Sequence, residues 1–428
     1  MNTLPGAPQL AYHGGELRFE GCRLDDLADR FGTPLYVYSR NAMLDALAGY
    51  QRALAGRHHL VCYAVKANAS LAVLQTFERA GCGFDIVSGG ELMRVLAAGG
   101  RADRVVFSGV GKTRAEMRAA LGAGVRCFNV ESEAELDALS RVAVDAGRSA
   151  RVSLRVNPDV DAGTHPYIST GLRHNKFGIA HDRALAAYRR AAALPGLAVA
   201  GIDCHIGSQI TDAAPYRDAL ERLLDLVEAI EADGIAIEHL DLGGGLGITY
   251  ADEAPPSPEE LLGGLLERID ARGHGGRTIL VEPGRSLVGN AGLLLTEALY
   301  LKPGAGPDAK HFCIVDAAMN DLMRPAMYEA WMAIVACRPR HDEPARRWDV
   351  VGPVCESGDW LGRDRELALR AGDRLAVLSA GAYGMSMASN YNSRGRPAEV
   401  MVDGERARLI RDREDPASLF AGERLLPD

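Results

Sequence analysis

A lysine follows a short apolar segment early in the chain. Residues 61–65, VCYAV, have the character of a buried strand, and Lys66 comes next, in the sequence VKANAS. A lysine that is desolvated at the end of a buried strand loses charge and becomes a nucleophile. The alternative is a solvated lysine in an ordinary turn, and this stretch taken alone favours that simpler interpretation.

Two glycine-containing turns follow later apolar segments. GGGLG at 243–247 comes after HLDL, and EPGRS at 282–286 comes after TILV. Glycines between a strand and a helix let backbone N–H groups approach a phosphate closely. They also serve tight turns that bind no ligand. Two such turns on neighbouring strands indicate a phosphate site more strongly than either turn alone.

Glu282 and His205 add acid–base groups to this set. A lysine, a phosphate site and a carboxylate together are typical of a pyridoxal phosphate enzyme, in which the lysine binds the cofactor covalently. An acidic residue then keeps the pyridine nitrogen protonated. Glu282 suits that role, although it could instead cap a helix or pair with an arginine. His205 could stack on the ring, but a histidine near a strand end more often belongs to a hydrogen-bonded scaffold.

Eight short, mostly apolar segments would position these residues. They are residues 59–64, 83–88, 104–109, 126–131, 151–157, 201–207, 239–245 and 278–284. Continuous apolar character is expected of parallel strands that are buried on both faces. Because helical patterns alternate with these segments, the sequence predicts a closed (β/α)8 TIM-like barrel. An open doubly wound sheet is the alternative, but no GxGxxG motif follows the first strand.

The predicted helices carry start signals. Four begin with a capping box, in which a Ser or Thr and a Glu three residues later satisfy backbone N–H groups that the helix cannot. These pairs are Ser88–Glu91, Thr113–Glu116, Ser132–Glu135 and Ser257–Glu260. Functional groups of a barrel lie at the carboxyl ends of its strands. Polar residues gather there in this sequence: Lys66, Asp85, Ser88, Ser108, Asn129, Glu131, Asn157, His205, Ser208, Glu282 and Arg285. That pattern strengthens the case for Lys66 as the nucleophile.

The alternation of strand and helix patterns ends after residue 290. Strand patterns at 311–317, 348–357, 373–381 and 397–410 indicate a β-rich domain, and Asp403-Gly404 in the last of them predicts a hairpin turn. We therefore predict a barrel domain at 34–290 and a β-sandwich domain formed by 1–33 and 291–428. The first roughly 30 residues show neither a helical nor a barrel pattern, and they could add a strand to that second domain. Residues 157–179, rich in Gly, Pro and His, are expected to form an active-site loop.

Composition narrows the class of protein. The chain has 428 residues and a net charge of -9, and it carries no basic block. Nucleic acids and anionic membranes reward basic surfaces, so neither is an expected partner. We see no signal peptide and no apolar run long enough to cross a bilayer. The eight cysteines form no CxxC or metal-type cluster. They predict reduced thiols in a cytoplasm, mostly core residues, and no bound metal.

A set of motifs occurs in one order: YAVKAN, FDIVSGGE, HIGSQ, GGGLGI, EPGR, CESGD and GAYG. With them the chain resembles the fold-type-III pyridoxal phosphate decarboxylases, most closely the diaminopimelate decarboxylases, from about Thr33 to the C-terminus. The resemblance implies an alanine-racemase-like barrel with a β-sandwich domain, in a homodimer with shared active sites. The implied reaction is decarboxylation of meso-2,6-diaminopimelate to L-lysine and CO2, the last step of lysine biosynthesis.

The resemblance also implies roles for residues that bind the cofactor. Lys66 would hold pyridoxal phosphate covalently, His205 would stack on its ring, and Glu282 would contact its pyridine nitrogen. Further cofactor contacts are implied for Ser208, Gly243, Gly244, Gly245, Pro283, Gly284, Arg285 and Tyr383.

Other implied roles concern the substrate. Its distal carboxylate would bind Arg285, Arg324 and Tyr328, and Tyr383 would reach the substrate region as well. Cys355 and Glu356 would come from the partner chain, the first as proton donor and the second as ligand of the distal amine. Without the CESGD motif, Cys355 could equally be an inert buried thiol. The alternative for Arg324 is a surface ion pair.

Three rival functions share the barrel. A decarboxylase of ornithine, arginine or lysine handles substrates without a distal carboxylate, so Arg324 and Glu356 argue against it. A racemase needs a proton donor on each face of the ring, and the CESGD segment disfavours it. A non-catalytic cofactor-binding protein would have lost substrate or proton-donor residues, which this sequence keeps.

Overall fold

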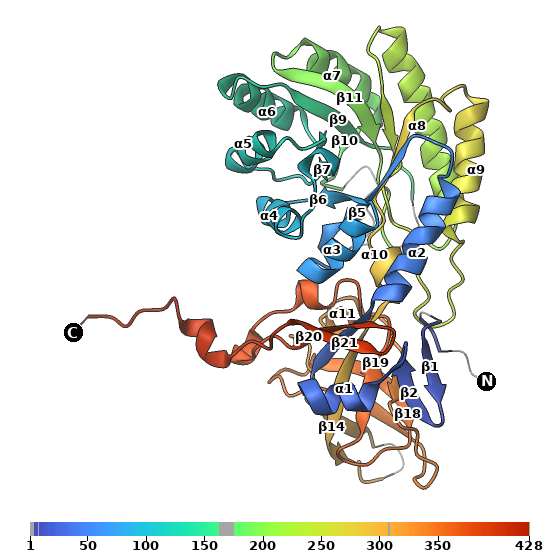
Figure 1. Cartoon of the computed structure of the whole chain (residues 1–428), viewed down its shortest axis with the longest axis vertical. Helices are drawn as coiled ribbons and strands as arrows, with labels where there is room; N and C mark the ends of the chain where they lie inside the picture. Colours follow the sequence, from blue (N-terminus) through green and yellow to red (C-terminus); the bar gives the residue numbers. More distant parts are fainter. Residues whose placement is uncertain (1–3, 7, 162–174, 307–308, 428) are drawn as a thin grey trace. The chain divides into compact units, whose positions relative to one another are not determined.

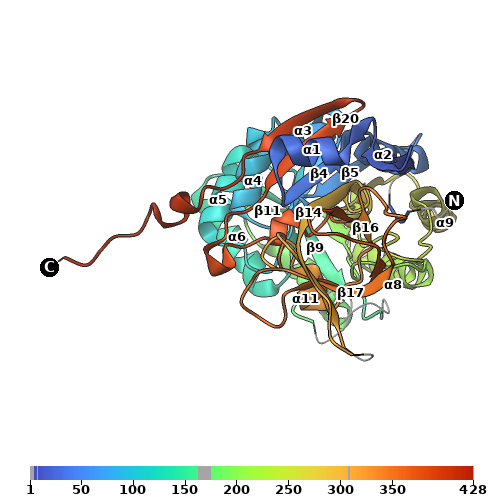
Figure 2. The ribbon, with the colours of Figure 1, turned by 90° about the horizontal axis from the view of Figure 1, so that it is seen from below.

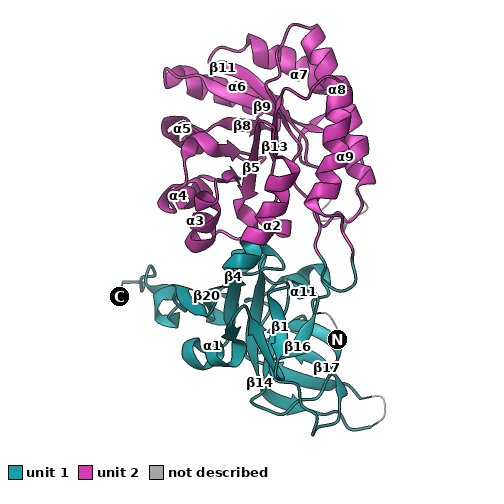
Figure 3. Cartoon of the chain, turned by 45° about the vertical axis from the view of Figure 1, so that its right-hand side comes forward, with its two compact units in different colours: residues 1–43, 249–253, 288–428 teal, residues 44–248, 254–287 magenta. Residues whose placement is uncertain are grey.

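The computed structural model describes residues 4–6, 8–161, 175–306 and 309–427. The chain forms two compact units, shown in different colours in Figure 3. One, here called the barrel unit, comprises residues 44–248 and 254–287. The other, here called the β unit, comprises residues 1–43, 249–253 and 288–428. The predicted loop at 157–179 includes residues 162–174, which lie outside the described part of the chain.

Eight parallel strands close into a barrel. They are β5 (His59–Ala64), β6 (Gly83–Ile86), β7 (Val105–Phe107), β8 (Cys127–Val130), β9 (Ala150–Asn157), β11 (Leu197–Asp203), β12 (His239–Asp241) and β13 (Thr278–Val281). Each strand pairs with the next, and β13 pairs back with β5. A two-residue strand, β10 (Ile179–Ala180), extends the edge of β9. All eight predicted strands are confirmed, and with them the predicted barrel.

Helices surround the barrel strands in Figure 1. They are α2 (Arg40–Ala53), which leads into the barrel, and then α3 (Leu71–Arg79), α4 (Gly89–Ala97), α5 (Arg114–Ala123), α6 (Glu133–Asp145), α7 (His181–Ala193), α8 (Ala214–Ala232), α9 (Pro258–Ala271) and α10 (Arg285–Val288). The apolar faces of these helices pack inward. In α8, for example, Leu220, Leu223, Leu224 and Val227 are buried at helical spacing.

Two of the four predicted capping boxes are complete. Thr113 caps α5 and Ser257 caps α9, each with the reciprocal bond from the glutamate three residues later. In α4 and α6 the serine accepts as predicted. There the glutamate reaches one residue further back: Glu91 accepts from the N–H of Val87 at 2.7 Å. In α6, likewise, Glu135 accepts from the N–H of Glu131 instead of the N–H of Ser132.

The β unit is built on a large mixed sheet. Its strands are β4 (Leu35–Ser39), β14 (Gly292–Lys302), β15 (His311–Val315), β16 (Ile334–Ala336), β17 (Arg346–Val351), β18 (Trp360–Leu367), β19 (Arg374–Val377), β20 (Ala398–Asp403) and β21 (Arg406–Arg411). Strands β20 and β21 form the predicted hairpin. Figure 2 shows β20, from the C-terminal part of the chain, beside β4 from the N-terminal part, and the two pair in parallel.

The N-terminal residues hold more structure than their sequence indicated. Strands β1 (Leu10–His13), β2 (Glu16–Phe19) and β3 (Cys22–Arg23) form a small sheet, and helix α1 (Leu24–Phe31) follows. The expectation of no helix here is wrong. Arg23 occupies the cap position and makes no capping bond, so the helix has no start signal. Its buried Leu24 and Leu27 hold it against the core of the β unit.

One more short helix, α11 (Arg324–Tyr328), lies in the β unit. Within the ranges described above, no helix combines the length and the apolar character that a bilayer crossing requires.

Candidate active site

Lys66 lies at the mouth of the barrel, in a single 3-10 turn that follows β5. Its Nζ is 2.6 Å from Oδ2 of Asp85, a fully buried residue on the neighbouring strand β6. The lysine side chain keeps 37% of its surface exposed. A lysine paired in this way is held in one place while its amine stays accessible from the mouth. The pairing with a buried carboxylate favours a functional lysine over a freely solvated one in an ordinary turn.

The turn that contains Glu282 packs directly beside this lysine. The carbonyl oxygen of Pro283 accepts a hydrogen bond from the N–H of Ala64, at 3.0 Å, in the last residue of β5. A Cβ on Gly284 would lie 3.1 Å from the Cβ atoms of Ala64 and Ala67. Glycine therefore lets the turn approach the lysine segment without displacing it.

The glycine turn after β12 is shaped by close backbone contacts. Gly243 has φ +66° and Gly245 has φ +103°, conformations that favour glycine. A Cβ on Gly243 would meet the carbonyl oxygen of Cys204 at 2.5 Å, and one on Gly244 would overlap the carbonyl oxygen of Glu282. The N–H of Glu282 donates to the carbonyl oxygen of Gly243 at 2.7 Å. The two predicted turns thus lie side by side.

His205 belongs to the same region. Its Nδ1 accepts a hydrogen bond from the N–H of Gly244 at 3.2 Å, which places the proton of the neutral ring on Nε2. Burial, followed by the charges of Arg155 and Lys66, lowers the pKa of His205 well below its ordinary value. The ring is therefore a neutral flat surface that is anchored to the glycine turn.

Glu282 is buried among other carboxyl groups. Its Oε1 accepts a hydrogen bond from Nδ2 of Asn129 at 3.2 Å. Burial raises the pKa of Glu282 well above its ordinary value, and the nearby charges of Asp241 and Asp85 raise it further. A carboxylate in this setting gains by facing a cationic N–H donor.

Arg285 and Ser208 form a polar pair at the same rim. The Nε and Nη2 atoms of Arg285 donate to Oγ of Ser208 at 3.3 and 3.0 Å. Arg285 is almost fully buried and is the first residue of α10. A buried guanidinium of this kind suits a phosphate or carboxylate.

Three buried charged residues in the barrel interior were not singled out by sequence reasoning. Asp203 and Asp241 end β11 and β12, and Arg155 on β9 lies 3.3 Å from Glu131. Asp203 and Asp241 interrupt otherwise apolar strand segments. An aspartate at the end of a buried parallel strand was the available signal.

In the β unit, Arg324 is buried rather than part of a surface ion pair. Its Nη1 donates to the hydroxyl of Tyr250 at 2.6 Å, and its guanidinium lies 4.7 Å from the centre of that ring. Tyr328 ends the same short helix and is half-buried. Sequence reasoning missed Tyr250, which has no motif of its own.

Cys355 is exposed, whereas the other seven cysteines are buried, as expected for core thiols. Its N–H donates to Oδ1 of Asn392 at 2.9 Å. The neighbouring Glu356 accepts a hydrogen bond from Tyr391, and this bond raises the pKa of the tyrosine. Oδ2 of the buried Asp359 accepts from the N–H of Val354 at 2.7 Å. The alternative of an inert buried thiol is therefore wrong for Cys355.

Tyr383 is held in a strained conformation. Its φ of +55° is rare for a bulky residue. The flanking Gly381 and Gly384 have no room for a Cβ, which would meet backbone atoms of Val288 and Ala380 respectively. Strain of this kind is frequently found at functional sites.

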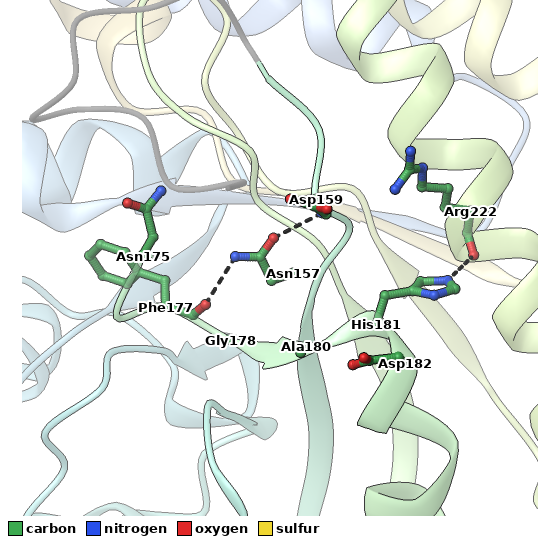
Figure 4. Close-up of a pocket in the computed structure, with 9 residues that line it drawn as sticks. All are labelled: Asn157, Asp159, Asn175, Phe177, Gly178, Ala180, His181, Asp182 and Arg222. Atoms are coloured by element: carbon green, nitrogen blue, oxygen red, sulfur yellow. Dashed lines mark hydrogen bonds between the residues drawn. The ribbon is translucent and has the colours of Figure 1, made fainter. Parts of the chain in front are cut away.

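A separate cavity of about 200 Å³ lies near the end of β9. Figure 4 shows Asn157 at its centre, with Nδ2 bonded to the carbonyl of Phe177 and Oδ1 to the N–H of Asp159. His181 at the start of α7 bonds the carbonyl oxygen of Arg222 on α8. Asn157 is a strand-end residue noted from the sequence. The described lining of this cavity does not include the lysine, histidine or glutamate of the predicted site.

The barrel residues fit a pyridoxal phosphate group. An accessible amine, a buried carboxyl group, a neutral imidazole and a glycine turn with a buried arginine lie on adjoining strand ends. The turn leaves no room for Cβ atoms, as a backbone cradle for a phosphate requires. We assign these groups to one site. The five predicted residues of the β unit, Arg324, Tyr328, Cys355, Glu356 and Tyr383, are described within that unit.

Comparisons with known proteins agree with this chemistry. The family model described as the pyridoxal binding domain of pyridoxal-dependent decarboxylases matches residues 41–289. A diaminopimelate decarboxylase of Pseudomonas aeruginosa is 60% identical over 417 residues, which cover 97% of this chain and 99% of that protein.

Two solved structures are also similar to the chain. Diaminopimelate decarboxylase from M. jannaschii, in complex with L-lysine, has a TM-score of 0.93 and 38% identity, and the match covers 99% of both chains. The Helicobacter pylori enzyme complexed with L-lysine has a TM-score of 0.88 and 40% identity, over 93% of this chain and 98% of that one. With a fold, a strand-end site and near full-length similarity in agreement, the chain belongs to the diaminopimelate decarboxylase family of pyridoxal-dependent decarboxylases.

Proposed function

We infer that the protein decarboxylates meso-2,6-diaminopimelate to L-lysine and CO2 with pyridoxal phosphate, the last step of lysine biosynthesis. The observation that carries this inference is the grouping of Lys66, Glu282 and the glycine turn at one rim of the barrel, in a chain of this family. Pyridoxal phosphate supplies an electron sink for the electron pair that remains when CO2 leaves.

Each of several barrel residues is proposed to bind a different part of that cofactor. Lys66 provides the amine for covalent attachment, and Asp85 orients that amine at 2.6 Å. Glu282 would accept a hydrogen bond from the pyridine nitrogen, because its burial makes a cationic partner favourable. His205 would stack on the ring as a neutral imidazole, so it would add no competing positive charge.

The phosphate is assigned to the glycine turn and the residues around it. Gly243, Gly244 and Gly245 are proposed to form the turn that receives the phosphate. The N–H groups of Gly243 and Gly244 shape this turn by donating to Asp241 and His205. The N–H of Gly245 and the hydroxyl of Ser208 are proposed as the donors to the phosphate. The Pro283–Gly284–Arg285 segment fixes the neighbouring turn. Tyr383 of the β unit is proposed to reach the phosphate and the substrate.

Recognition of the distal end of the substrate is assigned to the β unit, with Arg285 of the barrel. Arg324 and Tyr328 would bind the distal carboxylate, and Glu356 the distal amine. Arg324 suits this task because its guanidinium is buried and held by Tyr250, so little freedom is lost on binding. A protein with net charge -9 needs such local cations to hold a dianion.

Cys355 is proposed as the group that protonates the carbon from which CO2 has left. It is exposed in its own chain and fixed through its backbone, which suits a residue that serves the active site of a partner copy. We therefore propose a homodimer with shared sites. An exposed thiol with this task must stay reduced, which favours a cytoplasmic location.

A substrate panel tests the function. The purified protein is incubated with pyridoxal phosphate and, separately, with meso-diaminopimelate, L-lysine, L-ornithine and L-arginine, while CO2 release is measured. We expect release from diaminopimelate alone, with lysine as product. Release from one of the monocarboxylates would mean that the distal site is misassigned. Lys66→Ala should lose both turnover and the visible absorption of the bound cofactor, and a variant that kept both would refute the assigned chemistry.

A further inference from the structure

The acidic interior of the barrel carries an inference that concerns Asp241. This residue ends β12, is fully buried, and was assigned no role above. One of its oxygens, Oδ1, accepts a hydrogen bond from the N–H of Gly243 at 3.0 Å. The other, Oδ2, is buried and has no N–H or O–H donor among the described residues, but the Asp241 side chain lies within hydrogen-bond reach of the Glu282 carboxyl group. Asp241 thus has one oxygen committed to the glycine turn and one available for another partner.

The position of Asp241 links two parts of the cofactor site. Its side chain holds the N–H of Gly243, and the carbonyl oxygen of that glycine accepts from the N–H of Glu282 at 2.7 Å. One short chain of hydrogen bonds therefore runs from Asp241 through the phosphate turn to the carboxylate assigned to the pyridine nitrogen. A shift of Asp241 would move both ends of the cofactor site.

Charge counting shows that this region must hold protons. One carboxylate oxygen from each of Asp203, Asp241 and Glu282 lies within 4.8 Å of the other two, and all three residues are buried. Among the described residues, the cations that act on these carboxyl groups are paired elsewhere: Lys66 with Asp85, and Arg155 with Glu131. Three buried carboxyl groups at this separation, with no ion pair to a described cation, do not all ionise.

Charged and titratable side chains from the neighbouring strands surround the cluster of Asp203, Asp241 and Glu282. The titratable and charged groups that act on it are Cys62, Lys66, Asp85, Cys127, Glu131, Arg155 and Cys204. Burial raises the pKa of Asp241 to about 6, and it raises the pKa of Asp203 and Glu282 well above their ordinary values. These directions agree with the charge count.

We propose that Asp241 is a positioning residue that fixes the phosphate turn through Oδ1 and shares a proton with Glu282 through Oδ2. The shared proton leaves Glu282 ready to accept the pyridine N–H while the cluster as a whole avoids full ionisation. This inference rests on the proposed function, because it assigns Asp241 to the pyridoxal phosphate site. It predicts that one side chain controls two separable properties, the grip on the phosphate and the pH dependence of cofactor binding.

The first test compares pyridoxal phosphate with pyridoxal, which lacks the phosphate, as ligands of the cofactor-free protein. Asp241→Ala should weaken pyridoxal phosphate binding by roughly tenfold or more, the effect of one lost buried hydrogen bond. Pyridoxal binding should weaken less, because pyridoxal loses only the indirect effect of the turn on Glu282 and has no phosphate to lose contact with the turn. Asp203→Ala is the matched control: it removes a carboxyl group of the same cluster that has no bond to the glycine turn.

The second test uses Asp241→Asn, which keeps an acceptor oxygen for Gly243 and loses the titrating proton. The ratio of the affinity for pyridoxal phosphate to the affinity for pyridoxal should return to the wild-type ratio. The acid limit of pyridoxal phosphate binding should move to lower pH, because Glu282 loses a neighbouring negative charge that raises its pKa. A purely structural role would restore the ratio and leave the pH profile unchanged.

The outcomes separate this inference from the proposed function. Equal losses of the affinity ratio in Asp241→Ala and Asp203→Ala would show a general loosening of the barrel and overturn the inference. An Asp241→Asn protein with the wild-type pH profile would overturn the shared proton. A wild-type chain that binds no pyridoxal phosphate would refute the proposed function itself, and the inference with it.

Discussion

Replacing Asp241 with Asn should stabilise the cofactor-free protein above about pH 6. The folded protein holds the proton of Asp241 more tightly than the unfolded chain does, since burial raises its pKa from the ordinary 3.8 to about 6. A carboxyl group with a raised pKa contributes most to stability below its unfolded pKa, and that contribution is lost as the pH rises through the folded value. An asparagine does not titrate and avoids this loss.

The size of the effect follows from the two pKa values. Their separation corresponds to about 3 kcal/mol of stability lost by pH 8, and roughly half of it is lost by pH 5. Asp241 is fully buried, so solvent screening does not reduce this value much. For a unit of this size, about 3 kcal/mol corresponds to a change in Tm of roughly 6–12 °C.

The assay can follow the barrel by itself. All three tryptophans, Trp331, Trp348 and Trp360, lie in the β unit, whereas most of the helices lie in the barrel unit. Denaturation is therefore followed by far-UV circular dichroism for the barrel, with tryptophan fluorescence as an internal control for the β unit. Stability is measured between about pH 5 and pH 8 for the wild type and for Asp241→Asn.

A surface variant completes the design. Asp145→Asn removes an exposed carboxylate at the end of α6 and should change stability by only about a few tenths of a kcal/mol. The free energy of unfolding of Asp241→Asn could instead fall with pH as steeply as that of the wild type, or be lower than that of the wild type at pH 8. Either result would mean that the Asp241 carboxyl group does not have a raised pKa in the folded protein, and the reasoning would fail.

Three further predictions concern the site itself. Gly244→Ala should weaken pyridoxal phosphate binding by at least roughly tenfold, because its Cβ would overlap a backbone carbonyl, whereas Gly263→Ala on α9 has open space and should be neutral or slightly stabilising; fluorescence titration distinguishes them. Brief alkylation of the native protein should modify Cys355 and spare the seven buried thiols, and Asn392→Ala should change its rate, as peptide mass spectrometry would reveal; unchanged labelling would contradict the anchoring role. Arg324→Lys should raise KM for diaminopimelate by about tenfold or more with a smaller change in kcat, and a variant with unchanged KM would remove Arg324 from the distal site.

The sequence indicated the barrel clearly because a parallel barrel has a strong local signature. The strands are mostly apolar, helical patterns alternate with them, and four of these helices begin with a Ser or Thr cap. The four cap serines and threonines all accept as expected. The glutamates of two boxes reach a different N–H, because a flexible side chain can choose between neighbouring donors and sequence spacing does not fix that choice.

Other features had no local signal. Helix α1 begins at an arginine that makes no capping bond, so only its packing against the core reveals it. Tyr250 contacts Arg324, and Asn392 contacts Cys355, across 74 and 37 residues of chain. Pairings of this kind are created by the tertiary fold. They could not be inferred from spacing in one sequence.

Asp203 and Asp241 lie between these cases. Their positions at strand ends were visible, but an aspartate in a glycine-rich turn region has an ordinary explanation as a turn residue. Only the closed barrel shows that both side chains face the same interior as Glu282, within 4.8 Å of it. The sequence therefore indicates where polar groups occur, and the fold decides that they act on each other.

The acidic interior and the proposed cofactor explain each other. Left alone, three buried carboxyl groups without a committed cation destabilise the barrel as the pH rises. A protonated pyridine nitrogen facing Glu282 would bring a positive charge to that point and offset the repulsion. The buried carboxyl groups thus lower the stability of the barrel when the site is empty. For the same reason, the site should prefer a ligand that has a cationic ring nitrogen at one end and a phosphate at the other. Asp241 touches both requirements through its two oxygens, which is why its two roles can be separated by the Ala and Asn variants.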